Sequence, residues 1–111
     1  MQREYRLFLK DILDATQRIE RFSVGITRQQ FEADEMRLHA ILMNLHIIGE
    51  AAKHVPQEVR DTTGNIEWRA IAGLRDIIAH HYFGINTDII WDVVQHKLPD
   101  LQQEITSLLQ P

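Results

Sequence analysis

The sequence predicts an all-α protein, arranged as an antiparallel bundle of four main helices. Apolar residues recur at three- and four-residue steps almost throughout, and no segment alternates apolar and polar residues as a half-buried strand does. Breaker residues divide this pattern into four stretches joined by short connections, for which antiparallel packing is the simplest arrangement. A length of 111 residues at 44% hydrophobic supports one core. We therefore expect a single domain over residues 1–111.

The first two predicted helices are separated by Ser23-Val-Gly-Ile26. The first is predicted over residues 3–22. The second is predicted to begin at Thr27, which forms a capping-box pattern with Gln30, and to be the longest. Pro56 ends it, because the residue before a proline is pushed out of helical geometry. The stripes expected to be buried are Leu7, Ile12, Leu13, Ala15, Ile19 and Phe22, then Leu38, Ile41, Leu42, Leu45, Ile48, Ala52 and Val55.

The last two predicted helices follow a turn-like connection over residues 56–66. The third begins near Glu67 and ends around Tyr82-Phe-Gly84, where the glycine can take the left-handed C-terminal position. The fourth is capped by Asn86-Thr87 and runs to the C-terminus, with a kink or break expected near Pro99. Their expected buried residues are Trp68, Ile71, Leu74, Ile77, Ile78, Ile89, Ile90, Val93, Val94, Leu98, Leu101, Ile105, Leu108 and Leu109.

Composition excludes several classes of function. The net charge of −4, from 16 acidic and 12 basic residues, argues against a protein that coats nucleic acid, and we expect no DNA partner. The chain has no cysteine, which rules out disulfides and thiolate chemistry and suits a reducing cytoplasm. We find no apolar run suited to a signal peptide or a membrane span, so we expect a cytoplasmic protein without a membrane partner.

Chemically capable side chains gather at the end of the third predicted helix, in Arg75-Asp-Ile-Ile-Ala-His80-His81-Tyr82. Arginine is permanently charged and binds phosphate through a planar fork. Histidine takes or gives a proton near neutral pH. RNA cleavage without a metal requires such a proton-transfer group and a cation that stabilises the charged phosphorane. The same pattern also fits an ordinary surface ion pair and a helix-end histidine favoured by the helix dipole.

Helical spacing divides this cluster into two faces. Asp76 and His80 are four residues apart, so the carboxylate can orient the imidazole. Arg75 and Tyr82 are seven apart and also share a face, whereas Arg75 and His80 lie about 140° apart around an ideal helix. Either the helix loosens near His80, or the site combines residues from two subunits across a two-fold axis. We favour a homodimer.

Other polar and aromatic residues have simpler interpretations. His39, His46 and Glu50 share one helical stripe, but a zinc site needs three or four convergent ligands, so we expect no metal and no cofactor. Glu50 stands among apolar residues, and a buried carboxylate there would require a partner such as Arg75. Trp68 and Trp91 are expected to anchor the core or an interface.

The pattern Arg75-x4-His80-x-Tyr82 resembles the signature of HepT-type proteins, a branch of the HEPN superfamily. The resemblance extends over nearly the whole chain, because further blocks occur in the family's usual order. These blocks are Ile47-Ile-Gly-Glu-Ala-Ala-Lys53, Val55-Pro56, Trp68-Arg-Ala-Ile-Ala-Gly-Leu-Arg75 and Tyr82-Phe-Gly-Ile85.

This resemblance implies a dimeric HEPN bundle that acts as a ribonuclease toxin of a type VII toxin–antitoxin pair. It assigns Arg75 and His80 as the catalytic pair, and it places Asp76 at a position that is commonly polar. Tyr82 becomes the residue that an MNT-type nucleotidyltransferase antitoxin modifies with AMP. The neighbouring His81 leaves open which imidazole acts. A helical module without catalytic activity, which only binds a nucleotidyltransferase or a nucleotide, is the alternative.

Overall fold

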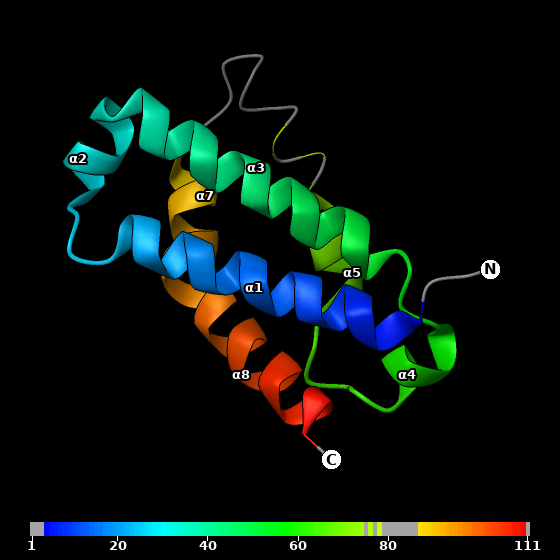
Figure 1. Cartoon of the computed structure of the whole chain (residues 1–111). Coiled ribbons are helices and arrows are strands. Elements are labelled where there is room, and N and C mark those ends of the chain that lie inside the picture. The colour runs from blue at the N-terminus through cyan, green and yellow to red at the C-terminus, as the bar shows by residue number, and fades with distance from the viewer. Residues whose placement is uncertain (1–3, 75, 77, 79–86, 111) are drawn as a thin grey trace.

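The computed structural model describes residues 4–74, 76, 78 and 87–110, and every regular element within them is helical (Figure 1). This confirms the all-α prediction. None of the described helices combines the length and the apolar run needed to cross a membrane. In chain order the elements are α1 (Tyr5–Ser23), α2 (Arg28–Ala33), α3 (Glu35–Ala52), α4 (Gln57–Asp61), α5 (Trp68–Ala72), α7 (Thr87–Asp92), the π-helical turn η1 (Val93–Lys97) and α8 (Leu98–Leu109).

Helix α1 is the centre of the bundle. It packs along both α3 and α8, and Figure 1 shows it between them, with α3 running in the opposite direction. Helix α5 packs on α3. The residues predicted to be buried in α3 are all buried. In α1, Leu7 was predicted to be buried but is 45% exposed, and Leu9 is buried instead. Each such Leu or Ile contributes roughly 1.5–3 kcal/mol by leaving water.

The second predicted helix is two helices, so the prediction of one continuous and longest helix is wrong. Its predicted start is confirmed, because Thr27 Oγ1 accepts from the Gln30 N–H at 3.1 Å and the Gln30 side chain accepts from the Thr27 N–H at 2.9 Å. The break lies at Asp34, whose backbone leaves helical geometry at φ −96° and ψ 89°. The Asp34 carboxylate then accepts from the Arg37 N–H at 3.0 Å and caps α3. The longest described helix is α1, with 19 residues.

The connection after α3 is more ordered than predicted, because it contains the one-turn helix α4. Pro56 occupies the N-cap of α4, and α3 itself ends at Ala52. Helix α5 begins at Trp68, as predicted from Glu67. The end that we predict for this helix, over residues 82–84, lies outside the described residues.

The fourth predicted helix changes geometry near Pro99, as expected, but one turn before the proline. Residues Val93–Lys97 form a π-helical turn in which the Leu98 N–H donates to the Val93 carbonyl. A proline ring inside a regular α-helix collides with the carbonyl four residues earlier. The wider turn relieves this conflict, so that Pro99 stands near the start of α8. Ile90, Val94, Leu98, Leu101 and Ile105 are buried as predicted, whereas Ile89 is 44% exposed.

Candidate active site

The predicted site begins where α5 ends, and Asp76 is its one described member. Arg75, His80, His81 and Tyr82 lie outside the described residues, so their roles remain predictions. Asp76 is helical and exposed, and its N–H donates to the Gly73 carbonyl at 3.0 Å. The described residues Leu74, Asp76 and Ile78, which follow α5, are therefore all helical.

One face of this helix is fixed against the bundle. Trp68, Ile71 and Leu74 follow at three-residue steps and are 7%, 8% and 4% exposed. Asp76 lies two residues after Leu74, which is about 200° around an α-helix. The buried face therefore turns the Asp76 carboxylate toward solvent, where a polar substrate can approach.

Arg60 joins the end of α3 to the start of α5. Its guanidinium donates to the Ala52 carbonyl at 2.5 Å and, through Nε, to the Val55 carbonyl at 3.0 Å. The same group lies 5.7 Å from the ring centroid of Trp68, whose Nε1 donates to Thr63 Oγ1 at 2.8 Å. A cation at the C-terminal carbonyls of a helix is stabilised by the helix dipole. This confirms Trp68 as a core anchor and adds Arg60, which we did not predict.

Helix α2 contacts the start of α7, which is the first described element after the motif residues 75–82. The Thr87 hydroxyl donates to Glu32 Oε1 at 3.0 Å, and Arg28 forms ion pairs with both Glu32 and Asp88. These contacts fix the start of α7 against α2.

An aromatic contact underlies these ion pairs. Phe31 is fully buried, and its ring centroid lies 5.1 Å from that of the half-buried Trp91, which confirms Trp91 as an anchor. Spacing along one helix could not predict this contact between α2 and α7, because the partners are about 60 residues apart. The only signal was a large aromatic residue near the start of each of two predicted helices.

The polar residues that share one stripe of α3, His39, His46 and Glu50, are exposed or partly exposed. The Glu50 side chain is 42% exposed and pairs with Lys53 at 3.0 Å, because its position on α3 rotates it away from the buried face. His39 and His46 are exposed. Within the part of the chain that the structure describes, no three His, Cys, Asp or Glu side chains converge in a way that could hold a metal ion.

Comparison with known proteins finds one family model and several similar proteins. A family model described as Ribonuclease HepT-like matches residues 12–108. A protein of Methanocaldococcus jannaschii is 37% identical over 97% of this chain and 89% of its own length. A protein of Caldanaerobacter subterraneus subsp. tengcongensis is 35% identical over 95% of this chain and 94% of its own length. Both are named provisionally as RNases. The "Probable ribonuclease HepT" of Thermococcus cleftensis is 33% identical over 97% of this chain and 98% of its own. No solved structure matches the chain significantly.

Proposed function

Because the chain belongs to the Ribonuclease HepT-like family, we propose that it is a metal-independent endoribonuclease and the toxin of a type VII toxin–antitoxin pair. The observation that carries this proposal is that the family match spans residues 12–108 and includes the complete pattern Arg75-x4-His80-x-Tyr82. We assign it to the cytoplasm as a single domain over residues 1–111.

The proposed reaction uses two side chains of the motif. The 2′-oxygen of a ribose attacks the adjacent phosphorus, and the bond from phosphorus to the 5′-oxygen breaks. His80 removes the 2′-hydroxyl proton or protonates the leaving oxygen, and the Arg75 guanidinium stabilises the charge on the phosphorane. Asp76, one helical turn before His80, holds the imidazole in one tautomer.

A homodimer would bring two copies of this motif to a shared cleft. The outer face of α3 supports such an assembly, because Met36 and Met43 are 83% and 60% exposed and lie two helical turns apart. Exposed apolar side chains that form a stripe on one helix are typical of an interaction surface. In such a dimer, Arg75 of one subunit could meet His80 of the other, although the two lie on different faces of one ideal helix.

The proposed antitoxin is an MNT-type nucleotidyltransferase that transfers AMP from ATP to Tyr82. The Tyr82 oxygen attacks the α-phosphorus of ATP, and pyrophosphate leaves. By helical spacing the attached phosphate would lie on the same face as Arg75 and occupy its guanidinium. Inhibition then needs no large conformational change, because the modification blocks the phosphate-binding group itself.

The catalytic assignment is tested with purified protein and RNA in the presence of EDTA. We expect cleavage by the unmodified chain and a loss of at least about a hundredfold in His80→Ala, as for removal of a general acid or base. His46→Ala, which changes an exposed histidine of α3, is the matched control and should cleave normally. Full activity in a folded His80→Ala variant would remove His80 as the catalyst. Growth arrest on expression that persists in Arg75→Ala would favour the alternative of a module without catalytic activity.

The modification is tested by mass spectrometry after co-expression with the neighbouring nucleotidyltransferase. We expect the chain to gain mass in whole AMP units and to lose that gain in Tyr82→Phe. The chain has two tyrosines, so Tyr5→Phe is the matched control and should be modified normally. A mass gain that survives in Tyr82→Phe would assign the AMP to another residue.

A further inference from the structure

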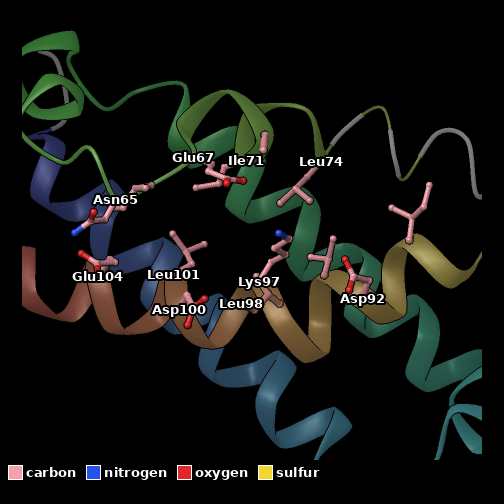
Figure 2. Close-up of a pocket in the computed structure, with 14 residues that line it drawn as sticks. Asn65, Glu67, Ile71, Leu74, Asp92, Lys97, Leu98, Asp100, Leu101 and Glu104 are labelled. Carbon is pink, nitrogen blue, oxygen red and sulfur yellow. The ribbon is translucent and has the colours of Figure 1, made fainter.

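An apolar groove of about 350 Å³ lies between α5 and the segment from α7 to α8 (Figure 2). Helix α5 packs on α3, and α8 packs on α1, so the groove lies where these two pairs of helices face each other. Figure 2 shows Ile71 and Leu74 on the α5 side and Leu98 and Leu101 on the α8 side. The apolar residues that line the groove are Ile66, Ala70, Ile71, Leu74, Ile89, Val93, Leu98 and Leu101.

Carboxylates surround this apolar floor. Glu67 lies on the α5 side, and Asp92, Asp100 and Glu104 follow the opposite side, whereas Lys97 is the one basic residue among the described lining residues. In the described part of the chain, no ion pair engages any of these four carboxylates. The rim therefore presents a net negative charge beside an apolar surface. The exposed part of that surface is formed by Ala70, Ile89 and Val93, because the other apolar lining residues are at most 8% exposed.

The charge of the described rim residues disfavours two classes of occupant. RNA and free nucleotides carry phosphates, which four carboxylates repel. A second copy of this chain is disfavoured as well, because a two-fold contact of groove on groove would oppose the same acidic rims. An occupant must instead carry apolar side chains for the floor and positive charge for the rim.

We propose that the groove binds a basic amphipathic helix of a partner protein. A helix is the element that fits between two others, by inserting a row of side chains at i, i+3, i+4 and i+7. From Asp92 to Glu104 the rim follows twelve residues of helix, or about 18 Å, which matches about three turns of a bound helix. Lysines or arginines on both flanks of that helix would meet Glu67 on one side and Asp100 and Glu104 on the other.

The test uses a synthetic, fluorophore-labelled helical peptide with leucines at i, i+3, i+4 and i+7 and lysines on both flanks. We expect it to bind the full chain, with a Kd that rises with salt. A peptide with glutamates in place of the lysines should bind at least about tenfold more weakly, a difference of about 1.4 kcal/mol. Amide chemical shifts should change along the groove, at residues 65–74 and 89–104.

Charge variants of the chain then test the rim directly. Asp100→Lys combined with Glu104→Lys should raise the Kd of the lysine-flanked peptide at least about tenfold. Glu20→Lys combined with Glu58→Lys is the matched control, because it changes net charge equally on α1 and α4, away from the groove, and should have little effect. Lys97→Glu should tighten binding. Ala70→Gln, at an exposed position on the groove floor, should weaken it without changing charge.

Three results would overturn the proposal. One is equal affinity for the two peptides, and another is chemical-shift change confined to other surfaces. The third is a loss of self-association in the rim variants, measured by sedimentation equilibrium, which would identify a second copy of the chain as the occupant. None of these results depends on RNA cleavage.

Discussion

Arg60 illustrates what a single side chain contributes that spacing along the chain does not predict. It stands in a segment that reads as a turn-like connection, and a charged residue there is expected to face solvent. In the structure its guanidinium satisfies the carbonyls of Ala52 and Val55 at the end of α3 and lies against the ring of Trp68. Its role depends on the packing of α5 beside the end of α3, which no pattern along the sequence predicts. The position of α5 relative to α3 therefore depends on a residue whose role was not predicted.

We expect Arg60→Ala to lower the free energy of unfolding by about 2–4 kcal/mol, because hydrogen bonds from a charged donor contribute about 1.5–3 kcal/mol each and are not fully additive. Urea denaturation followed by circular dichroism measures this change. Arg69→Ala, an exposed arginine of α5, is the control and should stay within about 0.5 kcal/mol of the unmodified protein. Equal losses in the two variants would show that Arg60 acts only through its charge.

At the scale of elements, helix starts were more predictable than helix breaks. Thr27 and Gln30 form a recognisable pair, and the capping box that they predict is present. Asp34 gives no such signal, because no proline or glycine accompanies it and position 37 is an arginine rather than a Glu or Gln. Its capping role is apparent only from its bond to the Arg37 N–H. A polar residue inside an otherwise helical pattern is therefore compatible with both a continuous helix and a sharp turn.

The break at Asp34 makes a test possible. Asp34→Ala should lower the free energy of unfolding by about 1 kcal/mol, the usual contribution of an N-cap side chain. Asp34→Asn keeps the capping oxygen but removes the charge that pairs with Arg37 at 3.3 Å, and it should retain most of the stability. Comparing the two variants therefore separates the contribution of capping from that of the ion pair. Thermal melts of the three proteins measure the difference. A loss in Asp34→Asn as large as in Asp34→Ala would assign the contribution to the ion pair.

At the scale of the whole molecule, helical periodicity predicted the bundle because α1, α3 and α8 bury the apolar stripes that define them, with Ile12, Ile41 and Ile105 fully buried. The catalytic site is a different kind of problem. Arg75 and His80 lie on different faces of an ideal helix, so no pattern within one regular helix predicts that they meet. In the proposed dimer they would meet across two subunits. Their assignment still rests on the motif and on family membership.

A mixing experiment tests whether two subunits complete each site. Arg75→Ala and His80→Ala should each be inactive alone. Co-expressed in equal amounts, half of the dimers are mixed, and each mixed dimer keeps one complete site if Arg75 and His80 come from different subunits. RNA cleavage should then recover to about a quarter of the unmodified level. If both residues of a site belong to the same subunit, the mixture contains no complete site and stays inactive.

The π-helical turn over Val93–Lys97 affects how relatives of this chain should be aligned. Such a turn accommodates one residue more than an α-helical turn while the helices on either side keep their buried faces. Loss of one residue between positions 93 and 97, combined with replacement of Pro99, would therefore restore regular α geometry and leave Ile90 and Ile105 in the core. We expect homologues that lack one residue here to share the same packing, and a single-residue gap at this point to mark a straighter helix rather than a different fold.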